Sequence, residues 1–249
     1  MRYFLQLSYN GTRFHGWQQQ PNATSVQQTL ADALVMLLRT PTEVVGCGRT
    51  DTGVHASRYF AHFDTDVLLP PKLLMSINAV LPRDISVKNI HSVADDAHAR
   101  FDATHRGYHY FITEQRDPFR QETTWCYPQI SRISLDDLNA AAAMLLEYQS
   151  FATFCKTNDG AHTKLCKITA SHWQTDGQTW TYHIAANRFL RGMVRLIVGM
   201  CLNVAHGRLT LAQVRTALDT QQPLSPSLSV PPTGLFLSDV GYPFLVPRS

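Results

Sequence analysis

Alternating apolar and polar residues open the chain. Tyr3, Leu5, Leu7 and Tyr9 recur at every second position, which is the spacing of a half-buried strand that ends at the Asn10-Gly11 turn. After residue 25 the apolar spacing changes to three and four residues and continues to residue 38, which predicts a helix of about four turns. Ser25 followed by Gln28 resembles a capping box at its start.

The same criteria divide the rest of the chain into short strands and helices. We expect strands at residues 42–47, 57–65, 84–93, 104–113, 164–173, 180–186 and 234–240. We expect helices at residues 70–80, 134–146 and 189–205, and another around 211–218.

These elements do not alternate strictly as strand, helix, strand, so the pattern predicts an α+β fold. Strands and helices follow in loosely similar order in two halves, residues 1–105 and 106–249. We therefore predict two similar α+β halves that share one mainly antiparallel sheet, with flanking helices and a central cleft.

A content of 44% hydrophobic residues in 249 is enough for a substantial core. No run approaches the roughly 18 to 20 apolar residues of a membrane span, and the N-terminus lacks a signal-peptide core, so we expect a cytoplasmic protein without membrane contact. The five cysteines are scattered, with no CxxC pair, and the eleven histidines form no HExxH. We therefore expect no metal.

The formal net charge of +3 does not by itself predict a nucleic-acid partner. Cationic and aromatic residues are interleaved, however, as in the segment containing Arg188, Phe189, Arg191 and Arg195. Cations that bind phosphates beside rings that stack on bases are typical of looped or single-stranded RNA recognition. An ordinary solvated surface is the alternative.

The segment GRTDTGVHA is a glycine-punctuated loop between two apolar strands, and it carries Asp51. Such a loop is able to present a carboxylate at the rim of a cleft. Alternatively, Asp51 caps a turn by accepting hydrogen bonds from nearby backbone amides. Spacing alone favours the capping role.

The run from Cys47 to Ala56 resembles the signature of the tRNA pseudouridine synthase A family, in which this Asp is the catalytic residue. Four further segments match in the same order: YNGTRFHGWQQQP, HARFDATHRGYHY, NRFLRGMVRLIVG and GLFLSDV. Five ordered motifs over almost the whole chain are far more specific than any one of them. The chain differs from the usual family residues at five positions, Asp102, Gly107, Arg188, Leu190 and Arg191. These differences concern the details of backbone contacts and the range of substrates, and none of them is a site residue.

The resemblance implies a role for each site residue. Asp51 is the nucleophile or general acid/base, Arg195 is its ion-pair partner, and Tyr108 stacks on the target uracil and is a candidate base. Arg49 enters the RNA helix as the nucleotide turns out, and Leu235, with Leu237, lines the pocket.

Physical chemistry agrees with these residue types. A flipped-out base costs a few kcal/mol, and the enzyme needs a group to fill the vacancy and a ring to receive the base. Stacking on an aromatic ring contributes on the order of 1–3 kcal/mol. A buried Arg195 needs an anion. The alternatives are a packing role for Tyr108 and an Arg195 whose head reaches solvent or phosphate.

The reaction that the resemblance implies is uridine isomerisation to pseudouridine at positions 38, 39 and 40, in the anticodon stem-loop of tRNA, by a homodimer. Substrate and product are isomers, so no redox cofactor and no metal is needed. Two rivals are a catalytically silent RNA-binding module and a nucleoside hydrolase. The hydrolase normally needs a second carboxylate or a metal.

Overall fold

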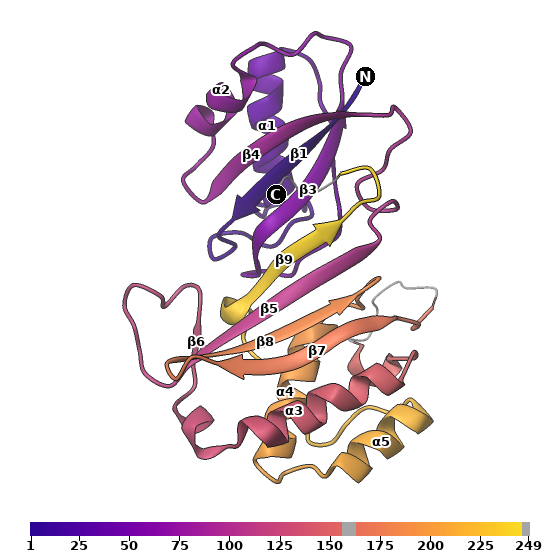
Figure 1. The fold of residues 1–249 in the computed structure, drawn as a ribbon. Coiled ribbons are helices and arrows are strands. Elements are labelled where there is room, and N and C mark those ends of the chain that lie inside the picture. Colours follow the sequence, from indigo (N-terminus) through magenta and orange to yellow (C-terminus); the bar gives the residue numbers. More distant parts are fainter. Residues whose placement is uncertain (156–162, 246–249) are drawn as a thin grey trace. The chain divides into compact units, whose positions relative to one another are not determined.

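The computed structural model describes residues 1–155 and 163–245. They form two compact units, Met1–Thr104 with Phe236–Ser249 and His105–Leu235 (Figure 1). The sequence placed everything after residue 105 in the second half, and for the C-terminal segment this is wrong. The last strand returns to the first unit, where Phe236 pairs with His55.

The first unit is built on a sheet in the order β4-β1-β3-β9, with β2 beside β3. Its pairs are antiparallel except for β3 with β9. The strands are β1 (Arg2–Tyr9), β2 (Val44–Gly46), β3 (His55–Asp64), β4 (Ile85–Val93) and β9 (Leu235–Gly241). The predicted alternation is present in β1, where Leu5, Leu7 and Tyr9 are buried, and Phe4 is buried as well.

Two helices of the first unit follow the predicted pattern: α1 (Val26–Leu38) and α2 (Leu73–Val80). Ser25 caps α1, because its side chain accepts a hydrogen bond from the amide of Gln28. The predicted capping box is incomplete, since the Gln28 side chain donates to Asp32 at 2.6 Å. A helical i,i+4 partner therefore takes the place of the reciprocal cap.

The second unit has three main strands in the order β5-β8-β7, all antiparallel, and a short β6 parallel to β5. They are β5 (His105–Thr113), β6 (Trp125–Cys126), β7 (Ile168–Thr175) and β8 (Thr179–Ala186). Tyr110, Ile112, Tyr182 and Ile184 are buried, as period-two spacing requires of one face of a sheet.

The helices of the second unit are α3 (Leu135–Ala143), α4 (Met193–Ala205) and α5 (Leu211–Thr220). Among the described residues of this unit, 3-10 turns accompany them: η1 (Pro128–Arg132), η2 (Met144–Glu147), η3 (Ala152–Phe154) and η4 (Pro232–Gly234). Helix α4 begins four residues later than predicted, because Gly192 precedes it with φ +71°, outside the helical region. Helix α5 has a complete capping box between Thr210 and Gln213, which the sequence analysis missed.

The predicted α+β class is confirmed, as is the mainly antiparallel pairing of the strands. Helices α3 and α4 contact each other, and α3 also packs on β7 (Figure 1). A sheet shared by both halves and a central cleft concern the two units together, and these stay predictions.

Candidate active site

Asp51 lies on the loop between β2 and β3, in the first unit, and its side chain is partly exposed. The amide of Val54 donates to the Asp51 carbonyl oxygen at 3.1 Å, which closes a four-residue turn. Gly53 is its third residue, with φ +76°. A type II turn requires this positive φ at its third position, and glycine adopts it without strain. The backbone that follows Asp51 is therefore fixed by a tight turn.

The N-terminal loop, residues 10–18, supports this turn before and after Asp51. The amide of Trp17 donates to the Thr50 carbonyl at 3.3 Å, and the amide of Gly53 donates to the Phe14 carbonyl at 3.3 Å. Gly16 has φ +87°, and a Cβ there would lie 2.4 Å from the Thr50 carbonyl oxygen. Only glycine allows the two backbones to approach so closely.

Buried side chains also hold the residues on the N-terminal side of Asp51. Thr50 is buried, and its hydroxyl shares a 2.9 Å hydrogen bond with the hydroxyl of Tyr9. Trp17 stacks on Tyr59 with ring centroids 4.2 Å apart, and the Tyr59 hydroxyl donates to the carbonyl of Gly48. The residues flanking Asp51 thus rest on the core of the first unit.

Arg49 is exposed, and glutamines anchor it at its inner end. Its Nε donates to Gln18 Oε1 at 3.2 Å. The side-chain Nε2 of Gln18 donates in turn to Oε1 of Gln27, in α1, at 3.0 Å. The Nε2 of Gln27 donates to the Val44 carbonyl at 2.8 Å. These bonds connect the guanidinium to helix α1 and strand β2.

Tyr108 and Arg195 lie in the second unit. Tyr108 is a half-buried residue of β5, opposite Ile184 of β8. Its ring meets Phe189 at a centroid distance of 5.1 Å and an interplanar angle of 86°, so Phe189 sets the tilt of the ring without stacking on it. The predicted packing role and the predicted stacking role are both compatible with this geometry.

Arg195 lies in the first turn of α4 and is half-buried. Its Nε donates to the Val230 carbonyl at 2.6 Å, and the Val230 amide donates back to the Arg195 carbonyl at 3.3 Å. Burial raises the pKa of Tyr110 well above its usual range, and the positive charge of Arg195 opposes that shift. Because Asp51 and Arg195 belong to different units, their ion pair stays a prediction.

Leu235 and Leu237 are both buried, on β9, and Leu237 pairs with Ala56 of the signature. The C-terminal motif is thereby brought beside the end of the Asp51 loop, where Phe236 also pairs with His55. A second bond across these strands joins Arg58 to Asp239 at 2.9 Å.

Comparison with known proteins agrees with the motifs. Residues 141–243 match a family model described as tRNA pseudouridine synthase. A protein of Parabacteroides distasonis named tRNA pseudouridine synthase A is 43% identical over 244 residues, which cover 97% of this chain and 96% of the relative. The protein of that name in Bacteroides fragilis is 44% identical over 245 residues, with the same coverage. The chain belongs to the tRNA pseudouridine synthase A family. A more distant member, tRNA pseudouridine synthase A 2 of Clostridium perfringens, is 33% identical over 239 residues, 96% of this chain and 98% of the relative.

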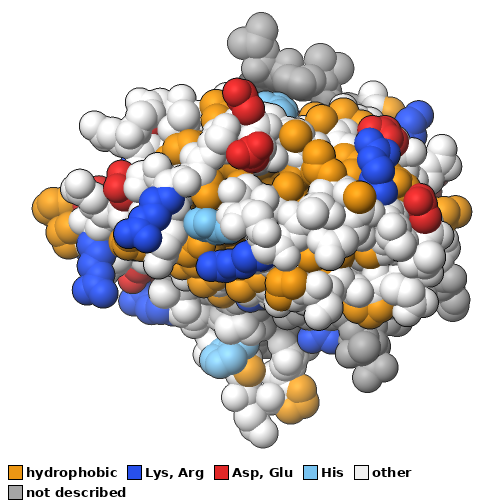
Figure 2. All heavy atoms as spheres, turned by 90° about the horizontal axis from the view of Figure 1, so that it is seen from below, with side chains coloured by type: hydrophobic (Ala, Val, Ile, Leu, Met, Phe, Trp, Pro, Cys, Tyr) orange, Lys and Arg blue, Asp and Glu red, His pale blue; other side chains and the backbone are white. Residues whose placement is uncertain are grey.

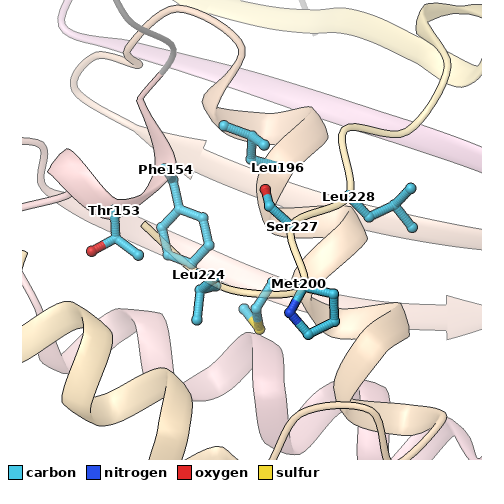
Figure 3. Close-up of a pocket in the computed structure, with 8 residues that line it drawn as sticks. Thr153, Phe154, Leu196, Met200, Leu224, Ser227 and Leu228 are labelled. Atoms are coloured by element: carbon cyan, nitrogen blue, oxygen red, sulfur yellow. The ribbon is translucent and has the colours of Figure 1, made fainter. Parts of the chain in front are cut away.

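Two cavities of this family member lie away from its signature. One, in the second unit between α4 and residues 224–228, has a volume of only about 10 Å³ (Figure 3). That is room for a single water molecule and not for a nucleobase. Another, of about 320 Å³, is lined by residues 92–94, 96–97 and 244–245 and by Asp102. None of the predicted site residues lines either cavity.

The described ranges, residues 1–155 and 163–245, contain no group of three or more His, Cys, Asp or Glu side chains arranged to bind a metal. Within the same ranges no helix is long and apolar enough to span a bilayer. On the face seen in Figure 2, Lys and Arg side chains are separated by hydrophobic and uncharged ones. This face therefore presents no continuous basic surface.

Sequence reasoning missed the support that Gly16, Trp17 and Gln18 give to the Asp51 loop. Each lies inside a segment that carried the family resemblance, but no periodicity marks them. Their signal was the run of polar and glycine residues YNGTRFHGWQQ, which fits neither strand nor helix spacing. Such a run indicates a loop with a specific structure.

Proposed function

We propose that this chain converts uridine to pseudouridine at positions 38, 39 and 40 in the anticodon stem-loop of tRNA, with Asp51 as the catalytic carboxylate. As a member of the tRNA pseudouridine synthase A family it is an isomerase. The observation that carries the proposal is the Asp51 turn. Its backbone is held on both sides by the other N-terminal motif, while the carboxylate-bearing residue remains partly exposed.

The reaction breaks the bond between ribose C1′ and uracil N1 and forms one between C1′ and C5, after which C5 loses its proton and N1 carries one. Asp51 serves as the nucleophile, by attack at C1′ or on the ring, or as the base that removes a ribose proton. Because no atom is gained or lost, one oriented carboxylate and one proton acceptor suffice.

The other residues receive their roles from residue type and position. Arg49 is exposed beside Asp51 and anchored through Gln18, which suits a group that fills the gap left by a flipped nucleotide. We propose Tyr108 as the ring that receives the uracil and accepts its C5 proton, and Leu235 as part of the pocket wall.

Arg195 is proposed as the partner that orients the Asp51 carboxylate. The Val230 carbonyl accepts a hydrogen bond from its Nε, and a guanidinium is also able to pair with a carboxylate through its terminal nitrogens. Support comes from the held position of the side chain at the start of α4.

The proposal extends to the working state of the enzyme. We infer a cytoplasmic homodimer, without metal or cofactor, that binds tRNA through pooled cationic side chains. The net charge of one chain is only +3, which suits a dimer that pools the cationic side chains of two chains. Because such side chains bind phosphates, tRNA binding should weaken as the salt concentration rises. Chelator treatment should leave activity unchanged, and sedimentation should give twice the 28.0 kDa chain mass.

The test is release of tritium from tRNA labelled at uridine C5. The parent should release label, and Asp51→Asn should lower the rate at least about 100-fold, the range of an acid/base or nucleophilic group. Asp66→Asn, at an exposed position outside the site, is the matched control and should react like the parent. Binding without release would favour the silent RNA-binding module, and free uracil would favour the hydrolase.

A further inference from the structure

His55 is a signature residue to which no role has so far been given. It begins strand β3, four positions after Asp51, and none of its surface is exposed. A histidine that is fully buried must have its polar atoms satisfied, and the identity of its partners shows what the ring does.

Two contacts of the ring reach distant parts of the chain. Its Nδ1 accepts a hydrogen bond from the amide of Gly11 at 3.0 Å. The ring is also stacked on Phe236 of β9, with centroids 4.5 Å apart and an interplanar angle of 20°. An Nδ1 that accepts a hydrogen bond carries no proton, so the imidazole is neutral with its proton on Nε2.

Gly11 is the point where the N-terminal loop touches the end of the catalytic turn. A Cβ on Gly11 would lie 2.0 Å from the carbonyl oxygen of Val54, so the two backbones are in direct contact. The amide of that same Val54 closes the turn onto the Asp51 carbonyl. A displacement of Gly11 would therefore be transmitted to Val54 and from there to Asp51.

We propose that His55 is a positioning residue for Asp51. Its neutral Nδ1 fixes the amide of Gly11, Gly11 fixes Val54, and Val54 sets the turn that presents the carboxylate. Phe236 holds the imidazole plane from the other side. This inference rests on the proposed function of Asp51, and it assigns His55 to turnover and not to tRNA affinity, because the buried ring does not contact solvent.

Two amide substitutions separate the acceptor from the bulk of the side chain. In His55→Asn the side-chain oxygen occupies the place of Nδ1, so the Gly11 amide keeps its acceptor. In His55→Gln the amide group reaches the place of Nε2, and the Gly11 amide loses its acceptor. Both variants introduce the same functional group, which makes each a control for the other.

The readouts are kcat for tritium release, tRNA affinity and hydrogen exchange at the Gly11 amide. We expect His55→Asn to keep kcat within about threefold of the parent. We expect His55→Gln to lower kcat about 10- to 100-fold, the scale of a misplaced catalytic group. tRNA affinity should change less than twofold in both, and the Gly11 amide should exchange faster only in His55→Gln.

Equal kcat values for the two variants, or a loss of affinity in place of kcat, would overturn the inference. If His55→Gln does not fold, the Asn variant decides alone, because a decrease in kcat above tenfold with the Gly11 amide still protected contradicts the proposal. A parent without tritium release would instead refute the proposed function, so the two failures are distinguishable.

Discussion

The two units position their candidate site residues by different means. In the first unit Asp51 lies on a turn outside any strand or helix, and backbone contacts from residues 11–17 hold it. In the second unit Tyr108 lies on β5, whose backbone pairs with β8, and Arg195 lies on helix α4. The first arrangement depends on contacts with a loop, and the second on regular secondary structure.

Both units nevertheless contain a close backbone approach that only glycine permits. In the first unit Gly16 meets the Thr50 carbonyl, and in the second Gly199 of α4 meets the carbonyl of Leu228. The second contact brings residues 224–228 close to α4 (Figure 3). Two residues further along, the Val230 carbonyl accepts a hydrogen bond from Arg195. The two contacts differ in how directly they affect a candidate site residue. Thr50 is adjacent to Asp51 in the chain, whereas Leu228 affects Arg195 only through Val230.

The largest effect is expected from Gly16→Ala. At φ +87° an alanine is strained by roughly 1–2 kcal/mol, and its Cβ would lie 2.4 Å from the Thr50 carbonyl oxygen. We expect the free energy of unfolding to fall by about 3 kcal/mol or more in urea denaturation, with tritium release lost because Thr50 moves Asp51.

Gly48→Ala is the matched control for stability, because no atom lies within 4 Å of a Cβ at that position. Its free energy of unfolding should remain within about 0.5 kcal/mol of the parent. A Gly16→Ala protein with parental stability would show that the N-terminal loop does not hold the turn.

A smaller effect is expected from Gly199→Ala. Replacing a helical glycine by alanine favours the helix by about 1 kcal/mol, but the new Cβ would lie 1.9 Å from the Leu228 carbonyl oxygen. The clash outweighs the gain, and we expect a net loss of about 2 kcal/mol in the free energy of unfolding. Turnover, measured where both proteins are folded, should fall less than in Gly16→Ala, and an equal fall would remove the distinction between the two units.

The same contrast explains which parts of the fold and of the candidate site could be predicted from the sequence. Strands such as β1 and helices such as α1 follow from apolar spacing, because that spacing decides which face is buried. Asp51 was identified from its motif alone. The start of α4 was placed four residues too early, because residues 189–192 continue the apolar pattern until Gly192 adopts a positive φ.

Contacts between distant segments were beyond such reasoning. Nothing in the local sequence shows that β9 pairs with β3, or that the Gly11 amide donates to His55. Both contacts depend on the tertiary path of the chain. Both contacts also lie at the end of the Asp51 turn. The motif therefore identified the site residue, but it did not predict the contacts that hold this residue in place.

The smallest effect separates two histidines, the buried His62 of the first unit and the half-buried His183 of the second. Burial lowers the pKa of each to about 4. His62 Nδ1 accepts from the Ala99 amide at 3.1 Å, whereas His183 Nε2 is buried and has no hydrogen-bond partner among the described residues. The neighbouring His109 and His172 rings also disfavour a charge on His183.

A pKa below the ordinary 6.5 means that the unfolded chain binds the proton first, so stability is lost as the pH falls from about 6.5 toward 4. Since His183 Nε2 gains no bond, His183→Phe should cost little at pH 7. At pH 5 it should be about 1 kcal/mol more stable than the parent, after allowance for partial solvent screening. His62→Phe would instead destabilise at both pH values, because the buried Ala99 amide loses its acceptor. Urea denaturation at pH 7 and pH 5 checks both, and a parallel loss of stability in the parent and His183→Phe would show that His183 is not a source of the acid sensitivity.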